Sequence, residues 1–132
     1  TLLLSSAASD VYKRQFLGVH EGPQSISPLG FQEIKEGMII SNEPGYYKEN
    51  EYGIRIENLI LTKEMNDDSN HLYFKTLTLA PIDKNLISTE ILNDDEIKWI
   101  DTYHDKVYKN LSEFMQEKEL VWLRKSCEPI LQ

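Results

Sequence analysis

Two segments that are each expected to form a strand, and that each carry an acidic residue, constrain the fold of this chain most strongly. Residues 38–42 form a short apolar, β-rich run that stops at Glu43, where a Pro-Gly turn signal follows. Residues 53–61 alternate in polarity, so Arg55 and Glu57 share one face of a strand. We therefore expect two strands, each holding a carboxylate in a fixed position.

Two interpretations fit this pattern. In the first, Glu57 pairs with Arg55 or with a cross-strand partner on an exposed face, where such a pair contributes at most about 1 kcal/mol. In the second, the carboxylates of Glu43 and Glu57 bind hard divalent ions such as manganese, which prefer oxygen ligands to thiolates. The residue pattern alone leaves both interpretations open.

Four short motifs connect these segments to a known family. They are VHEGP around His20, the run EGMIISNEPGYY at residues 36–47, GIRIENL at residues 53–59 and LTLAPID at residues 77–83. Together they resemble the C-terminal part of the creatinase-like, or pita-bread, metallopeptidases, and in particular the X-Pro aminopeptidase P branch. The resemblance runs from Phe16 to the C-terminal end. It implies an α+β fold, the C-terminal half of a pita-bread catalytic domain, β-rich first and with a helical C-terminal tail.

The resemblance also implies roles for individual residues. Glu43 and Glu57 would be two of five ligands to two divalent metal ions, with manganese expected, and Glu57 would bridge both ions. Glu43 would also act as the catalytic general base. His20 would be catalytic without binding metal, by hydrogen-bonding the substrate carbonyl. Arg55 would orient a ligand carboxylate from outside the metal site, with a surface ion pair as the alternative.

The other three ligands of the family do not occur in this sequence. The resemblance implies two upstream aspartates and one histidine in an HGxG run, but the matching stretch around Val11 has neither histidine nor glycine. Residues 5–15, SSAASDVYKRQ, match a reading frame of a common transposase sequencing adapter. We therefore expect residues 1–15 to be a non-native segment joined to a truncated gene at about Phe16. A targeting segment is disfavoured because the apolar run is short and basic residues follow it.

The function implied by the resemblance is that of a fragment of a dinuclear-metal aminopeptidase. Such an enzyme hydrolyses the N-terminal residue from peptides with proline in second position. We expect the full-length parent to be the enzyme and this truncated chain to be inactive. Two alternatives stay open: a sibling activity such as prolidase, and a catalytically silent pita-bread binding protein.

Composition narrows the partners and the compartment. The net charge is -8, from 14 basic and 22 acidic residues, which disfavours nucleic-acid binding. Cys127 is the single cysteine, so an internal disulfide is excluded, and no apolar stretch approaches the roughly 20 residues of a membrane span. We expect a cytoplasmic parent with a proline-containing peptide as substrate, no nucleic-acid or membrane partner, and a homodimer as an open option.

The remaining elements follow from periodicity and end signals. We expect residues 16–87 to be the truncated catalytic portion and residues 88–132 a helical extension of the same domain. A polar surface loop is expected at 63–70 and a strand at 72–79. A helix should run from the N-cap Asn93, which has Glu96 three residues on, to about residue 115, and a second helix should cover 117–126.

Some aromatic and histidine side chains are interpreted as structural. His104 falls on the apolar stripe of the first helix, and we expect it to be packed and hydrogen-bonded rather than functional. His71 should be solvated. Of the adjacent Tyr46 and Tyr47, at most one can face the carboxylates, because neighbouring residues of a strand point to opposite faces.

Overall fold

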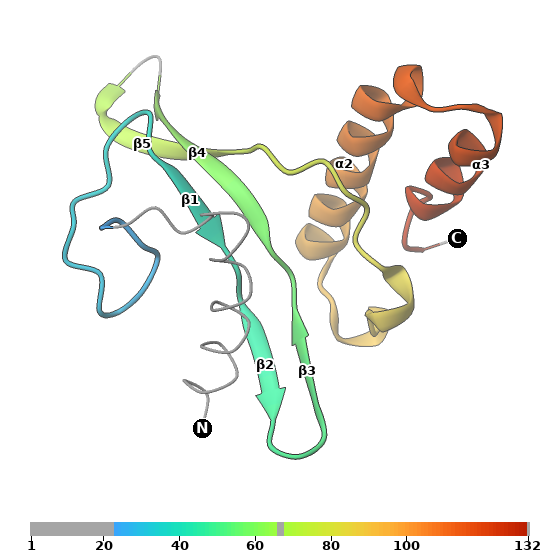
Figure 1. Ribbon diagram of the computed structural model, residues 1–132, viewed down its shortest axis with the longest axis horizontal. Helices are drawn as coiled ribbons and strands as arrows, with labels where there is room; N and C mark the ends of the chain where they lie inside the picture. Colours follow the sequence, from blue (N-terminus) through green and yellow to red (C-terminus); the bar gives the residue numbers. More distant parts are fainter. Residues whose placement is uncertain (1–22, 66–67, 132) are drawn as a thin grey trace. The chain divides into compact units, whose positions relative to one another are not determined.

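A computed structural model describes residues 23–65 and 68–131 of the chain (Figure 1). These residues divide into two compact units. We call the part up to Thr78 the strand unit and the part from Leu79 the helical unit. The order of strands first and helices afterwards is the α+β order predicted from the sequence.

The strand unit is built from antiparallel pairs. Its strands are β1 (Ile39–Asn42), β2 (Gly45–Lys48), β3 (Tyr52–Arg55), β4 (Asn58–Met65) and β5 (Asp68–Thr76). One sheet has the order β1-β4-β5, and β2 pairs with β3 separately. In Figure 1, β1 leads into β2 and β3 leads into β4, so that the four strands form one long hairpin.

The register of this hairpin is continuous across its interruption. Asn42 lies opposite Asn58 at the end of the β1–β4 pair, and Gly45 lies opposite Arg55 at the start of the β2–β3 pair. Residues 43–44 intervene on one side and residues 56–57 on the other, which is the same number. The two halves of the hairpin therefore stay aligned.

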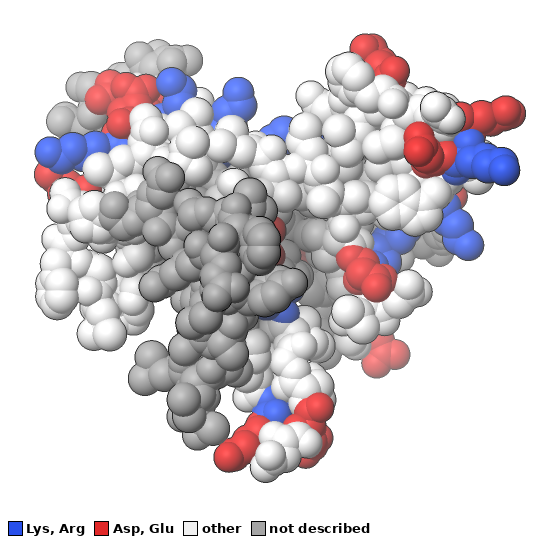
Figure 2. Space-filling model, in the orientation of Figure 1, with Lys and Arg blue, Asp and Glu red and all other residues white. Residues whose placement is uncertain are grey.

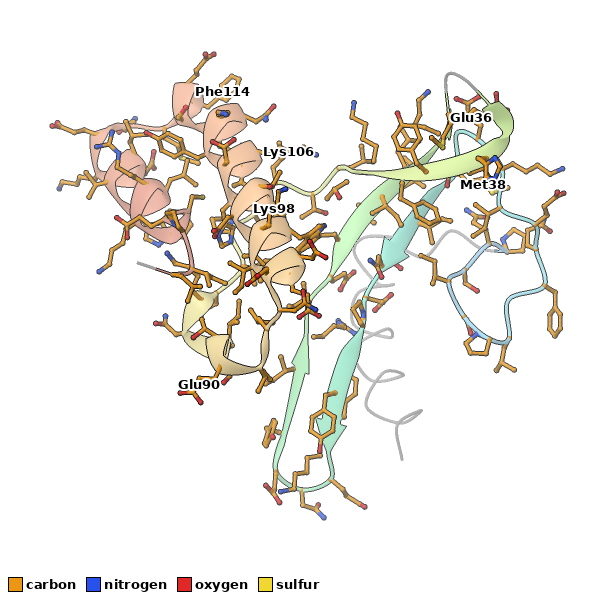
Figure 3. All side chains as sticks on the ribbon, turned by 180° about the vertical axis from the view of Figure 1, so that it is seen from behind. Glu36, Met38, Glu90, Lys98, Lys106 and Phe114 are labelled. Atoms are coloured by element: carbon orange, nitrogen blue, oxygen red, sulfur yellow. The ribbon has the colours of Figure 1, made fainter. Side chains whose placement is uncertain are left out.

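The far end of the strand unit differs from the sequence prediction. The expected polar loop at 63–70 is wrong, because β4 continues to Met65 and β5 begins at Asp68. Lys63 pairs with Tyr73 and Glu64 with Leu72. Polar residues can extend a strand here because the backbone forms the ladder while the side chains reach solvent. The ammonium group of Lys63 lies 3.0 Å from a carboxylate oxygen of Glu36. Glu36, which Figure 3 labels, lies in the segment before β1, so this ion pair ties that segment to β4.

The helical unit confirms both predicted helices. It contains α2 (Asp94–Leu111), α3 (Glu117–Ser126) and three single 3₁₀ turns, η1 (Lys84–Leu86), η2 (Thr89–Ile91) and η3 (Ser112–Phe114). Asn93 caps α2, and the side chain of Glu96 returns a bond to the Asn93 backbone, as a capping box requires. α2 ends at Leu111, before the predicted residue 115, and the 3₁₀ turn η3 follows it directly.

The core of the helical unit joins the two helices to the segment that follows the strands. Tyr103, Val107 and Leu123 are buried together. The Tyr103 hydroxyl donates to the backbone oxygen of Ala80 at 2.8 Å. His104 is fully buried, and its Nε2 accepts the backbone N–H of Ile82 at 3.1 Å, so its structural interpretation is confirmed.

Two further observations bound the architecture. Within residues 23–65 and 68–131, no helix is both long and apolar enough to cross a bilayer. The predicted non-native segment 1–15 lies outside the described residues, and the predicted division after residue 87 stays a prediction.

Candidate metal centre

Glu43 and Glu57 face each other in the interruption of the long hairpin. Glu43 directly follows β1, and Glu57 directly precedes β4. Because the register continues on both sides, these two residues occupy directly opposite positions. Opposite residues of an antiparallel pair have Cβ atoms about 5 Å apart. The chain thus places two carboxylates within reach of a common ligand.

Arg55 joins the two carboxylates. One of its guanidinium nitrogens lies 3.3 Å from a Glu43 oxygen, and another lies 3.4 Å from a Glu57 oxygen. The three side chains are 19%, 26% and 23% exposed for Arg55, Glu43 and Glu57, so the cluster is largely shielded from water. Like charges directly opposite one another destabilise a strand pair, and the guanidinium offsets that repulsion. We call these three residues the carboxylate site.

The interruption itself follows from the local sequence. Proline has no backbone N–H, so Pro44 cannot donate to the ladder beside Glu43. Its carbonyl oxygen still accepts the N–H of Ile56 at 3.3 Å, which keeps the strands together. Ser41 donates its hydroxyl to Glu43 at 2.9 Å and so helps to fix that carboxylate. The site therefore sits where regular pairing pauses but the strands do not separate.

The donor chemistry of the site fits hard divalent ions in part. Two carboxylates supply the oxygen ligands that such ions prefer. In the part of the chain that the structure describes, however, no group of three or more histidine, cysteine, aspartate or glutamate side chains could hold a metal ion. The carboxylate site can therefore contribute to a metal centre but does not complete one.

The other candidate residues lie elsewhere. His20 is outside the described residues. His71 is exposed on β5, as expected of a solvated histidine, although it lies in a strand rather than a loop. His104 belongs to the core of the helical unit. The structure thus brings together Glu43, Glu57 and Arg55 of the residues singled out from the sequence.

The sequence did not decide whether Tyr46 or Tyr47 faces the carboxylate site. The alternation of the strands puts Tyr47 on the face of the carboxylate site and Tyr46 on the opposite face. Tyr47 is half-buried, whereas Tyr46 is 60% exposed. Gly45 and Gly53 were the sequence signal that could have identified Tyr47, because an aromatic ring can lie flat on a strand where neighbouring side chains are missing.

Two protein-family sequence models match consecutive parts of the chain. The model of "Metallopeptidase family M24" matches residues 15–64, which include the whole carboxylate site. The description "C-terminal region of peptidase_M24" matches residues 70–130, which include both helices.

Individual relatives agree with these matches. "Probable Xaa-Pro aminopeptidase P" of the fungus Laccaria bicolor is 40% identical over 87% of this chain and 20% of its own length. "Xaa-Pro aminopeptidase app-1" of Caenorhabditis elegans is 40% identical over the same shares. A solved structure, the X-prolyl aminopeptidase from C. elegans, described as a cytosolic enzyme with a di-nuclear active site, matches with a TM-score of 0.65. It is 37% identical over 73% of this chain and 17% of its own.

The fold and the two family matches therefore define a piece of a metallopeptidase. The chain belongs to metallopeptidase family M24, and its fold is that of the C-terminal part of a creatinase-like, pita-bread domain. Its sequence is similar to the C-terminal part of proteins named Xaa-Pro aminopeptidases, the branch that the motifs indicated. The chain spans about a fifth of the length of the curated relatives that it matches.

Proposed function

We propose that this chain is the C-terminal part of a dinuclear-metal aminopeptidase that removes the N-terminal residue from peptides with proline in second position. The observation that carries the proposal is the pair of opposed carboxylates bridged by Arg55. This pair lies in a chain that is 40% identical to proteins named Xaa-Pro aminopeptidases. Without the similarity to these relatives, an ordinary ion pair within a hairpin would explain the same geometry.

Glu43 and Glu57 are the residues that would hold the metal ions in this proposal, with Glu57 as the ligand that both ions would share. Divalent ions bound there would acidify an attacking water and stabilise the negative charge that develops on the scissile carbonyl oxygen. Glu43 would accept the proton of the attacking water as general base. Arg55 keeps both carboxylates directed into the site, since it contacts each of them.

His20 has the remaining catalytic role. Its imidazole donates a hydrogen bond to the carbonyl oxygen of the scissile bond and can exchange a proton near neutral pH. This role rests on the VHEGP motif. It distinguishes His20 from the metal ligands and makes the two kinds of residue separable by mutation.

The setting of the enzyme completes the proposal. We take manganese as the metal, because hard divalent ions prefer carboxylate oxygens. We take the cytoplasm as the compartment, because the solved relative is described as cytosolic. A homodimer of the complete protein could use exposed aromatic surface on the helical unit, where Trp99 is 52% and Trp122 58% exposed. Nucleic acid is not a partner, because the net charge is -8 and the blue side chains of the visible helical surface in Figure 2 stand among red ones.

The test uses the complete protein encoded by the gene that contains this sequence. Purified protein should bind manganese and release arginine from Arg-Pro-Pro, while Arg-Ala-Pro should be a poor substrate. A protein that cleaves the dipeptide Ala-Pro but not the tripeptide would be a prolidase instead. A protein that folds and cleaves neither peptide would be a binding protein, and the proposal would fail.

A further inference from the structure

Tyr47 lies across the strand pair next to the carboxylate site. In the register of β2 and β3, Tyr47 is opposite Gly53, and Gly45 is opposite Arg55. Because side chains alternate along a strand, all four positions are on one face, the same face as the carboxylate site. Tyr47 is thus one step further along the hairpin than Arg55.

The ring of Tyr47 occupies the space that two missing side chains leave. A Cβ atom added to Gly53 would lie 2.5 Å from Cδ1 of the ring. A Cβ atom added to Gly45 would lie 2.7 Å from the Tyr47 hydroxyl oxygen and 2.8 Å from Cε2. All three distances are below 3.0 Å, which real Cβ atoms essentially never show, so a side chain at either position would have to displace the ring.

The direction of the ring follows from these contacts. Its base covers Gly53, and its hydroxyl end covers Gly45, so the ring points from the hairpin tip toward the carboxylate site. The hydroxyl oxygen lies 2.7 Å from the place where a side chain of residue 45 would begin, and residue 45 is directly opposite Arg55. Tyr46, by contrast, points to the other face and contacts the ring of Tyr52 at a centroid distance of 6.1 Å.

We propose that Tyr47 is a positioning residue of the carboxylate site, whose hydroxyl confines the Arg55 side chain so that the guanidinium stays between Glu43 and Glu57. An arginine side chain has many rotamers, and holding it in one of them costs conformational entropy. A hydroxyl fixed opposite Arg55 by a rigid ring removes alternatives to the bridging conformation. The glycines at 45 and 53 are the means by which the ring reaches that place.

This inference rests on the proposed function where it concerns metal binding, but its geometric part does not. The experiment is a double-mutant cycle in the complete protein with Tyr47→Phe, Arg55→Lys and the double variant. Tyr47→Phe keeps the ring over both glycines and removes the hydroxyl alone. Tyr46→Phe is the matched control, since it removes a hydroxyl from the neighbouring tyrosine on the opposite face.

Two quantities are measured for each variant. One is the dissociation constant for manganese, by calorimetric titration of metal-depleted protein. The other is the urea midpoint of unfolding of the metal-depleted protein, which does not depend on metal or catalysis. Failure of the wild-type protein to bind manganese would reject the proposed function, while the unfolding cycle would still test the proposed coupling between Tyr47 and Arg55.

The expected result is non-additivity between Tyr47 and Arg55. Tyr47→Phe should weaken manganese binding several-fold and lower the urea midpoint. The double variant should lose no more than the larger of the two single losses in either quantity. Tyr46→Phe should leave manganese binding unchanged and add independently to Arg55→Lys. Strictly additive losses, or a Tyr47→Phe variant that matches the wild type in both measurements, would overturn the proposal.

Discussion

Glu57 is the residue whose removal tests metal binding most sharply. It is 23% exposed, opposite Glu43, and is the proposed bridge between two ions. Glu57→Ala in the complete protein should abolish metal retention, since both ions lose a ligand. Metal content after gel filtration, measured by mass spectrometry, checks this.

The matched control for Glu57 is Glu49→Ala, which removes the same charge at the exposed tip of the β2–β3 hairpin. That variant should retain metal as the wild type does. Retention of full metal content by Glu57→Ala would contradict the assignment of this residue as a ligand.

His20 should behave differently from Glu57. Because its proposed partner is the substrate carbonyl, His20→Ala should keep the metal content of the complete protein and lower turnover, on the order of 10²-fold or more for a lost acid–base group. Steady-state kinetics together with metal analysis check this. A variant that loses its metal would show that His20 is a ligand and that its assigned role is wrong.

The residues of the site could be predicted from the sequence to different extents. Local motifs identify Glu43 at the end of an expected strand and Glu57 within an expected strand at 53–61, and alternation puts Arg55 on the face of Glu57. The expectation of one unbroken strand there is wrong, because β3 ends at Arg55 and β4 begins at Asn58. The contact of Arg55 with Glu43 could not be predicted, because it depends on the register between strands. The same holds for Tyr47, whose ring position depends on glycines of two different strands.

At the scale of elements, local signals predicted the helices better than the strands. The capping box of Asn93 and Glu96 fixes the start of α2 through contacts within a few residues of each other. Strand ends depend instead on a partner strand, which local polarity does not reveal. Lys63 and Glu64 look like loop residues, yet β5 pairs with both. The predicted loop was therefore too long.

The hydrogen bond that joins Ile82, in the segment after the strands, to His104 of α2 should depend on pH. Burial is the main cause that lowers the pKa of His104 below its ordinary 6.5, and the charge of Lys84 adds to it. The carboxylate of Asp101 opposes the shift. Neutral His104 accepts the Ile82 N–H through Nε2, and a protonated ring could not.

The sign of this dependence follows from linkage. Below about pH 6.5 the unfolded chain binds a proton that the folded chain resists, so stability is present above this pH and is lost as the pH falls. The slope contributed by one such histidine is at most about 1.4 kcal/mol per pH unit. Urea unfolding between pH 7.5 and 5.5 should show this loss in the wild type and a smaller slope in His104→Gln. Equal slopes would contradict the account.

At the scale of the whole molecule, the strand unit exposes apolar side chains on its sheet. Ile39 is 52% exposed, Phe74 48% and Leu72 40%. The chain also spans about a fifth of its relatives' length, and its described part holds two acidic candidates for a centre that needs more ligands. The motifs identified the family, whereas the described residues leave these apolar side chains of the strand unit exposed and bring together two carboxylates at the candidate site.

The isolated chain of 132 residues should therefore lack peptidase activity. With added manganese, it should release no arginine from Arg-Pro-Pro above the rate of a Glu57→Ala version of the same chain. Chromatographic detection of free arginine provides the readout. Hydrolysis that Glu57→Ala abolishes would show that the described carboxylate site suffices for catalysis, contrary to this account.

The central claim is that Glu43 and Glu57 are two ligands of a five-ligand dinuclear centre. The most direct measurement is long-read sequencing of the source genome upstream of the Phe16 codon. The account predicts two aspartates and an HGxG histidine in the same reading frame, with sequence other than residues 1–15 joined to Phe16. A native start codon with none of these ligands in frame would contradict it and would favour a binding protein.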